Sequence, residues 1–225
     1  TMQKATDLSI RHFNFWPNLS EEEKELLSRH TRLVTFKKGD QVHRGPLDCI
    51  GVLLIKSGQL RVYTLSEDGR EVTFYRLFPD DLSILSAACT LEAVSFDVYI
   101  DAEEDTEVLL TDAGTLKKLL EQNIHARCYA YELAATRLSE MLFKMQQILF
   151  LSADRRLAIF LLEESKKWKS DVIMLTHEQI ARYMGTAREV VSRLVKYFSQ
   201  EGWIKTARGR VEIIDKKALT DVAGI

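Results

Sequence analysis

A short segment near the C-terminus carries side chains whose hydrogen-bonding groups match the edges of nucleic-acid bases. Residues 187–202 predict a helix with one apolar face, formed by Val190, Val191, Leu194, Val195 and Phe198. The opposite face carries Arg188, Glu189, Ser192, Arg193 and Lys196. Arginine can grip both acceptors of guanine, glutamate can accept from the amino group of cytosine, and serine suits either kind of base. The chemistry that this face offers is therefore the reading of base edges.

The elements on either side of this helix position it. Residues 176–185 predict a short capped helix that ends at a glycine turn. After the second helix, two strands at 203–206 and 210–214 bracket a basic tip at Arg208. Helix, glycine turn, helix and basic hairpin in this order predict a winged helix-turn-helix. The alternative is a helical hairpin with a solvated charged face, which the succession of all these elements in one register disfavours.

The N-terminal half has a different periodicity. Ser20 and Glu23 have the spacing of a capping box, which starts a helix that runs to about Arg29. From Thr31 to about Asp112 the apolar residues alternate, and turn clusters separate six short segments at 33–36, 49–56, 59–65, 71–77, 96–102 and 107–110. Short strands at this density predict an antiparallel sandwich or roll.

After Asp112 the pattern becomes helical. Nine positions step alternately by four and three residues, and only one of them is polar: Leu120, Ile124, Arg127, Tyr131, Ala134, Leu138, Met141, Met145 and Ile148. So narrow a seam is typical of a helix that pairs with another helix, and it predicts a parallel homodimer with the eight apolar members at the interface. The alternative is a long helix packed on its own domain. Ser152 can then cap a further helix, which runs to about Trp168.

These patterns predict an α+β chain of three parts: an N-terminal antiparallel roll over 1–112, a dimerisation helix over 113–151 and a winged helix-turn-helix domain over 152–225. The charge changes between the halves. Residues 1–112 hold 12 Lys and Arg against 20 Asp and Glu, and residues 113–225 hold 19 against 13. This asymmetry suggests that the C-terminal half meets a polyanion.

Composition excludes several classes of protein. Of the 225 residues 46% are hydrophobic, which is too many for a disordered chain. The longest apolar runs fall far short of the ~20 residues that a membrane helix needs, and the first residues lack the apolar core of a signal peptide. We therefore expect a soluble, cytoplasmic protein with no membrane partner. Three cysteines without a CxxC pair predict neither a disulfide framework nor a zinc site, and no metal is expected.

The order of roll, long helix and winged helix-turn-helix resembles the CRP/FNR family of bacterial transcription regulators across nearly the whole chain. The most specific stretch is Thr-His-Glu-Gln-Ile-Ala-Arg-Tyr-Met-Gly-Thr-Ala-Arg-Glu-Val-Val-Ser-Arg-Leu-Val at 176–195. In that family a Glu and an Arg four residues later read the half-site, and they match Glu189 and Arg193. Arg188 matches the cyclic-AMP type of the family, whereas Ser192 matches the anaerobic-regulator type.

The resemblance implies a fold and a set of partners. The roll is expected to be a jelly roll like that of cyclic-nucleotide-binding domains. The partners are expected to be double-stranded DNA with a palindromic site, a second copy of the chain, and RNA polymerase. The DNA contacts are expected from Thr176, Thr186, Arg188, Glu189, Ser192, Arg193, Lys196, Lys205 and Arg208.

The sensing end departs from the cyclic-AMP type. That type follows its loop with Gly-Glu-Leu and holds the phosphate with an Arg-Ser pair. This chain has Phe-Pro-Asp-Asp-Leu at 78–82 and Phe-Asp at 96–97, and Met141 and Leu142 stand where that type places hydroxyls. A cyclic phosphodiester needs cations or aligned amide donors, which acidic side chains would oppose. We therefore expect an effector other than cyclic AMP, in a pocket lined by Asp80, Asp81, Leu82, Phe96, Asp97, Leu138, Met141 and Leu142.

The sequence assigns no cofactor and predicts no enzyme. An iron–sulfur cluster of the family's type needs a tight N-terminal cysteine cluster, which nothing before Cys49 supplies. A haem- or redox-responsive regulator stays open, because several side chains can serve as axial ligands: His43, Cys49, Cys89, His125 and Cys128. The five histidines are scattered, and the chain has no Gly-rich phosphate loop, HExxH or GxSxG motif. The other alternative is a dimeric ligand-binding protein without specific DNA binding.

Overall fold

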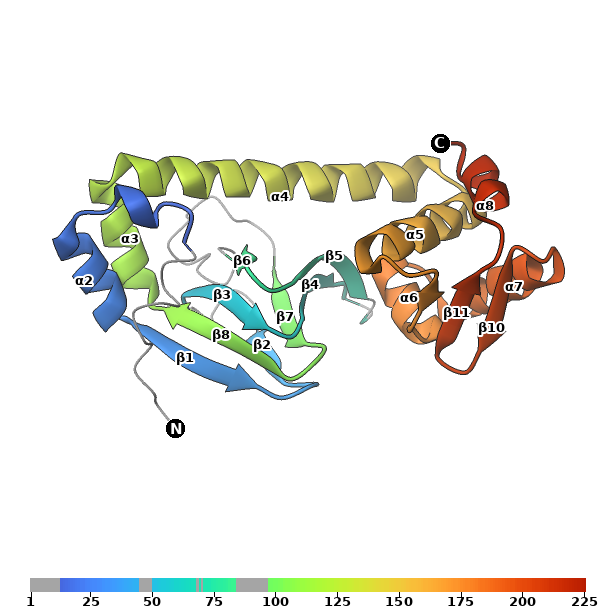
Figure 1. Ribbon diagram of the computed structural model, residues 1–225, viewed down its shortest axis with the longest axis horizontal. Helices are drawn as coiled ribbons and strands as arrows, with labels where there is room; N and C mark the ends of the chain where they lie inside the picture. Colours follow the sequence, from blue (N-terminus) through green and yellow to red (C-terminus); the bar gives the residue numbers. More distant parts are fainter. Residues whose placement is uncertain (1–12, 45–49, 68, 70, 84–96) are drawn as a thin grey trace. The chain divides into compact units, whose positions relative to one another are not determined.

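The computed structural model describes residues 13–44, 50–67, 69, 71–83 and 97–225. By its internal contacts the chain divides into two units, one of residues 1–70 and 74–141 and the other of residues 71–73 and 142–225. Figure 1 labels the elements of each. Among the described residues, no helix is both long enough and apolar enough to cross a membrane.

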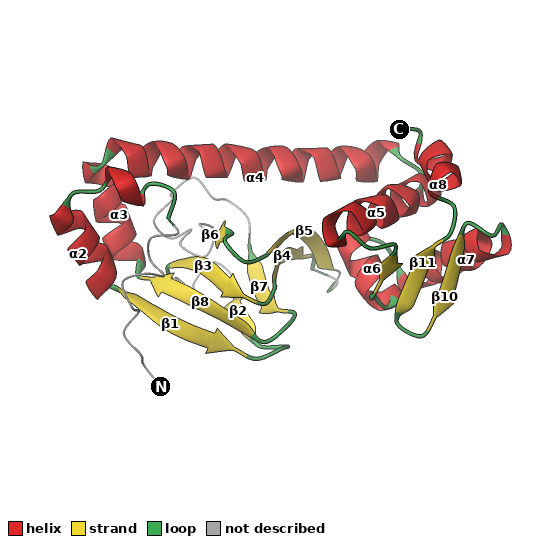
Figure 2. Cartoon of the chain, viewed as in Figure 1, coloured by secondary structure: helices red, strands yellow, loops and turns green. Residues whose placement is uncertain are grey.

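The first unit contains a roll of two sheets, and their registered strand pairs are antiparallel. One sheet has the strand order β1-β8-β3-β6 and the other β2-β7-β4-β5. The strands are β1 (Thr31–Phe36), β2 (Gln41–Arg44), β3 (Val52–Ser57), β4 (Leu60–Leu65), β5 (Glu71–Leu77), β6 (Leu82–Ser83), β7 (Tyr99–Ala102) and β8 (Thr106–Thr111). Helices η1 (Trp16–Asn18) and α2 (Glu21–Arg29) precede the sheets, and α3 (Ala113–Gln122) follows them. The predicted antiparallel roll is confirmed (Figure 2).

Strand β3 is apolar on both of its faces because it separates two cores. Val52 and Leu54 pack in a cluster with α2 and α3 residues, whereas Leu53 and Ile55 pack in a second cluster inside the roll. Alternate side chains of a strand point to opposite faces, so a continuous apolar run fills both clusters. Gly51 precedes the strand at φ +104°, and a Cβ there would overlap the backbone of β8 at Thr111.

Local signals fixed the ends of several elements, whereas short elements escaped prediction. Ser20 and Glu23 form the expected capping box of α2. Strands β2 and β6 were not anticipated, because β2 has only one apolar residue, Val42, and β6 has only two residues, so neither shows an alternating pattern. Ser152 stands at the N-cap of the next helix as expected, but its side chain makes no cap hydrogen bond to that helix backbone.

The long helical region is two helices rather than one. Asn123 has extended backbone (φ −113°, ψ 115°), which ends α3 before α4 (Ile124–Phe150) begins. The Asn123 Oδ1 accepts from the backbone N–H of His125 at 3.0 Å and of Ala126 at 3.1 Å. Its Nδ2 donates to the carbonyl of Asn18 at 3.1 Å and to the carboxylate of Glu23 at 3.0 Å. The predicted single helix was wrong here, because these contacts between distant segments stabilise the break.

Helix α4 is about 40 Å long, from 27 residues at 1.5 Å each. Ala126 is its only fully buried side chain. Tyr129 and Leu133 pack against the core cluster shared with α2 and α3, and Met141 packs against the cluster inside the roll. One side of the helix thus lies on its own domain while the rest of its circumference is exposed.

The second unit is a small α+β domain. It contains α5 (Ala153–Trp168), β9 (Val172–Ile173), α6 (His177–Met184), α7 (Arg188–Gln200), β10 (Ile204–Ala207), β11 (Arg210–Ile213) and α8 (Lys216–Ala223). The three strands form one sheet in the order β10-β11-β9. The helices pack around a single cluster that includes Leu157, Ile180, Val195 and Phe198. The predicted winged helix-turn-helix is confirmed, and β9 and α8 are additions to it.

We expect Asn123→Ala to destabilise the roll by about 1–2 kcal/mol, because it removes the cap of α4 and the link from this junction to α2. Thermal unfolding followed by circular dichroism should show a Tm lower by several degrees. The control is Gln122→Ala, an exposed neighbour on α3, which should leave the Tm unchanged. Equal Tm values for the two variants would contradict the role given to Asn123.

Candidate nucleic-acid interface and sensor site

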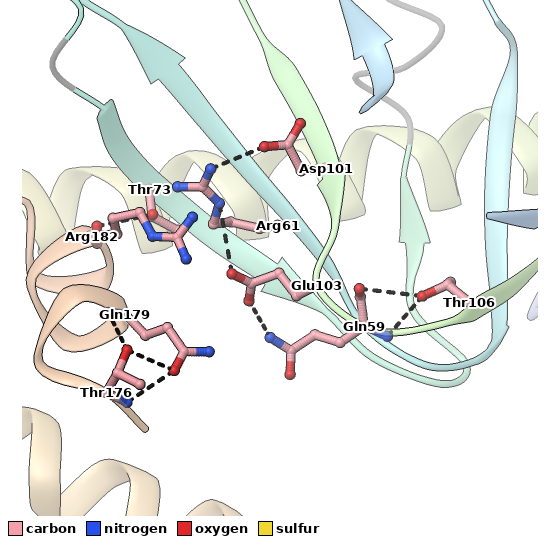
Figure 3. A network of polar contacts seen from close by, with 9 residues as sticks. All are labelled: Gln59, Arg61, Thr73, Asp101, Glu103, Thr106, Thr176, Gln179 and Arg182. Carbon is pink, nitrogen blue, oxygen red and sulfur yellow. Dashed lines mark hydrogen bonds and ion pairs between the residues drawn. The ribbon is translucent and has the colours of Figure 1, made fainter. Parts of the chain in front are cut away.

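The corner between α6 and α7 is fixed by local chemistry. Thr176 and Gln179 form a capping box at the start of α6 (Figure 3). Gly185 ends the helix in the left-handed conformation (φ +63°), and the N–H of Thr186 returns to the carbonyl of Ala181 at 3.0 Å. The inner faces of the two helices share one buried cluster, which includes Ile180, Ala181, Met184, Val191, Val195 and Phe198. This packing leaves the opposite face of α7 open.

The residues predicted to read bases lie together on that open face of α7. Arg188, Glu189, Arg193 and Lys196 are exposed, and Ser192 is half-buried. Acidic and basic side chains on one helix face offer both acceptors and donors to a major groove. Thr186, also predicted as a contact, is half-buried in the turn just before the helix.

Two residues at the start of α6 touch this reading face and were not singled out from the sequence. The Nδ1 of His177 lies 3.0 Å from the Oγ of Ser192, and the Oε2 of Glu178 lies 4.0 Å from the Nε of Arg188. His177 and Ser192 are 15 positions apart, and Glu178 and Arg188 are 10 positions apart. No helix or strand periodicity predicts contacts at these separations across a turn. The only sequence signal was their place in the first turn of the helix that crosses α7.

Thr176 is a predicted DNA contact, but its hydroxyl is hydrogen-bonded within the N-terminal cap of α6. It accepts from the backbone N–H of Gln179 at 3.2 Å and donates to the Gln179 Oε1 at 3.0 Å. The same Oε1 accepts the backbone N–H of Thr176 at 2.9 Å. A donation from Thr176 to a phosphate therefore requires the cap to open.

The hairpin carries its basic residues outward. Strands β10 and β11 pair from Ile204 with Ile213 to Ala207 with Arg210. Lys205 and Arg208 are exposed, and Gly209 turns the chain at φ +71°. Long flexible cations on a hairpin suit phosphates, which fix the register of a protein on DNA without carrying sequence information.

At the sensor end, Asp81 is paired with a cation that the sequence reasoning missed. The Nη2 of Arg137 on α4 lies 3.2 Å from the Asp81 Oδ1, and its Nη1 lies 2.9 Å from Glu140. The guanidinium also stands 4.7 Å from the ring centroid of Tyr75. Burial raises the pKa of the Tyr75 hydroxyl far above its ordinary value of 10.0, so this group stays neutral. Asp81, which was expected to oppose a phosphodiester, is therefore paired with a cation in the structure.

The other predicted pocket residues lie in different surroundings. Leu82 is buried in the cluster with α2 and α3, and Met141 packs against the cluster inside the roll. Asp97 is exposed, and Asp80 is an exposed residue with left-handed backbone (φ +73°). Leu138 and Leu142 are exposed on α4. The remaining predicted residue, Phe96, lies outside the described residues.

The roll also holds a buried ion-pair network that was not anticipated (Figure 3). Arg61 on β4 is 1% exposed and stands opposite Asp101 on β7, with 3.1 Å between the Nη2 and the Oδ2. Its guanidinium lies 4.0 Å from the ring centroid of Tyr63, and Glu103 is 3.8 Å from its Nε. Gln59 donates to Glu103. A buried cation requires such partners, so this network ties β4 to β7.

Three of the candidate axial ligands lie among the described residues. His43 is buried on β2, while His125 and Cys128 are exposed on α4. Cys49 and Cys89 lie outside the described residues. Within the part of the chain that the structure describes, no group of three or more His, Cys, Asp or Glu side chains is arranged to hold a metal ion.

A roll, a long helix and a winged helix-turn-helix define the architecture of a class of DNA-binding regulators, and the residues predicted to read bases lie on the open face of α7. Models of known protein families match both halves of the chain. Residues 33–123 match the cyclic nucleotide-binding domain, and residues 155–222 match the Crp-like helix-turn-helix domain.

Individual proteins match along most of the chain. A putative transcriptional regulator of the CRP/FNR family from Eubacterium rectale is 40% identical, with a TM-score of 0.89 over 96% of this chain and 100% of that one. The cyclic AMP receptor protein of Thermus thermophilus is 25% identical over 91% of this chain and 94% of its own. The transcriptional activator protein anr of Pseudomonas aeruginosa is 28% identical over 84% and 79%. This chain belongs to the CRP/FNR family, and it is a transcription regulator with a DNA-binding helix-turn-helix domain.

We expect Glu189→Ala and Arg208→Ala to impair DNA binding in different ways. Loss of a base contact by Glu189 should relax discrimination at one base pair by roughly 1–3 kcal/mol. Loss of a phosphate contact by Arg208 should weaken all sequences about equally and lower the salt slope by about one unit. Binding curves on a selected operator and its single-base variants, at two salt concentrations, measure both effects. A uniform loss of affinity in Glu189→Ala together with a changed sequence preference in Arg208→Ala would show that the domain docks on DNA in another way.

Proposed function

We propose that this regulator acts as a parallel homodimer on a palindromic DNA site. Two α7 helices related by a two-fold axis would enter successive major grooves about 34 Å apart. Arg188, Glu189, Ser192 and Arg193 would read base edges, and the wing would hold phosphates. The observation that carries the proposal is an apolar stripe along α4. This stripe is not covered by any of the described residues.

The stripe has the spacing of a coiled-coil seam. Eight exposed residues of α4 alternate by four and three positions: Ile124, Cys128, Tyr131, Ala135, Leu138, Leu142, Met145 and Leu149. Seven of these residues are apolar and the eighth is a thiol, so the whole seam suits burial against a second copy. Leu138 and Leu142 are more than half exposed in the single chain, at 54% and 52%.

This seam shares four members with the one expected from the sequence and shifts the other four by one residue. Ile124, Tyr131, Leu138 and Met145 belong to both. The four positions expected from the sequence but absent from this seam are Arg127, Ala134, Met141 and Ile148. Arg127 turns to the end of α3, where its Nε donates to the Leu120 carbonyl at 2.7 Å. Met141 packs against the roll, Ile148 is half-buried and Ala134 is exposed beside the stripe. Leu120 lies on α3, half-buried against the roll's core.

We infer that the effector is not a cyclic nucleotide, although relatives include a cyclic AMP receptor protein. Arg137, which lies beside the predicted pocket residue Asp81, is already paired with Asp81 and with Glu140. Asp80 and Asp97 add negative charge. An effector at this place would act by binding one arrangement of roll and helix better than another.

The setting follows from the family. We infer that the protein works in the bacterial cytoplasm, where the chromosome lies, and that it contacts RNA polymerase when bound to DNA. The relatives reported above are transcription regulators, and we assign no catalytic step to this chain.

We expect Leu138→Lys and Leu142→Lys to dissociate the dimer, because each would bury an unpaired charge in the seam. Sedimentation at low micromolar concentration should show monomers. The matched control is Phe143→Lys, an equally exposed apolar residue that lies off the seam, and it should remain a dimer. A dimer in all three variants would show that α4 does not form the interface.

We expect cyclic AMP and cyclic GMP to bind no better than millimolar, because the described pocket residues present carboxylates to the phosphodiester and the adjacent Arg137 is already paired. Titration calorimetry on the purified protein measures this directly. A micromolar Kd for either nucleotide would overturn the inference about the effector.

A further inference from the structure

His177 is the first residue of α6, yet its side chain contacts the reading face of α7. Its Nδ1 lies 3.0 Å from the hydroxyl of Ser192, and both residues are half-buried. The next residue, Glu178, lies within 4.0 Å of Arg188. The first turn of α6 thus touches two of the residues that face outward from α7.

The stability of the corner does not explain the contact. The start of α6 is capped by Thr176 and Gln179, and the packing of α6 on α7 comes from the buried apolar cluster. The His177 imidazole takes no part in either. The imidazole instead hydrogen-bonds to the side chain of Ser192, which would otherwise face solvent or DNA without this contact.

A partner of this kind restricts the orientation of a serine hydroxyl on a helix. The hydroxyl has one donor and two acceptor positions and rotates about its Cα–Cβ bond. An unrestrained serine within a helix can turn back and donate to the carbonyl four residues earlier, which is that of Arg188 here. The imidazole nitrogen occupies one hydrogen-bonding position in either tautomer, so it holds the oxygen in one rotamer and leaves the other positions for a base.

We propose that His177 is a positioning residue for base recognition, which holds the Ser192 hydroxyl in the orientation that reads one base pair. The inference rests on the docking of α7 in the major groove proposed above. It adds a determinant of sequence preference that does not itself touch a base edge.

Four variants of the full-length protein test this: His177→Ala, His177→Asn, Ser192→Ala and the double alanine variant. Each is measured on a duplex operator selected from random sequence and on its single-base variants. His177→Ala should relax preference at the base pair read by Ser192 by about 2- to 10-fold, the effect of one net hydrogen bond. It should have no further effect in the Ser192→Ala background, because the two residues act as one unit.

The asparagine variant separates positioning from simple loss of a side chain. Its amide places a hydrogen-bonding atom close to the position of the imidazole Nδ1, so His177→Asn should restore most of the preference. Equal melting temperatures for the four variants would show that folding is not the cause.

The outcomes distinguish the inference from the docking on which it rests. If Ser192→Ala relaxes preference while His177→Ala weakens every sequence equally, the docking stands and the positioning role is wrong. If Ser192→Ala leaves every preference unchanged, Ser192 does not read a base and the positioning role is wrong, while the docking of α7 is judged by the Glu189→Ala variant. Additive effects of the two alanine substitutions would also overturn the positioning role.

Discussion

The packing of α6 against α7 around a left-handed glycine is the interaction on which the reading surface depends. Gly185 ends α6 at φ +63°, a conformation that L side chains rarely adopt, and the chain turns there so that both helices share one apolar cluster. Because the inner faces are fixed, Glu189 and Arg193 are held outward on a rigid helix. The outward orientation of the residues proposed to read bases is thus a product of apolar packing on the inner face of α7.

The N-terminal unit shows the opposite arrangement, in which charged groups lie within a packed domain. Arg61 and Arg137 are both largely enclosed, and each is held by carboxylates and by an aromatic ring. Such cations are costly to leave without partners, so their carboxylates cannot be removed singly without loss. The Arg137–Asp81 pair joins α4 to the turn that precedes β6, and a ligand that competes for either partner would act on both elements.

The sequence was sufficient wherever the determining contacts are local. The capping box of Ser20 and Glu23, the glycine turn at 185 and the basic hairpin involve residues a few positions apart, and each could be read directly. The phase of the proposed α4 seam could not be fixed from the sequence, because consecutive helical residues are about 100° apart and both phases are mainly apolar. The break at Asn123, the Arg137–Asp81 pair and the His177–Ser192 contact depend on segments that only the fold brings together.

Helix α4 bears two separate surfaces on one backbone. Tyr129, Leu133 and Met141 lie against the roll, while Leu138 and Leu142 belong to the exposed stripe. Substitutions on one surface leave the atoms of the other in place. In the proposed dimer, a lineage with this architecture can therefore change the roll-facing side chains of α4 while the pairing geometry, and with it the spacing of the DNA half-sites, is inherited unchanged.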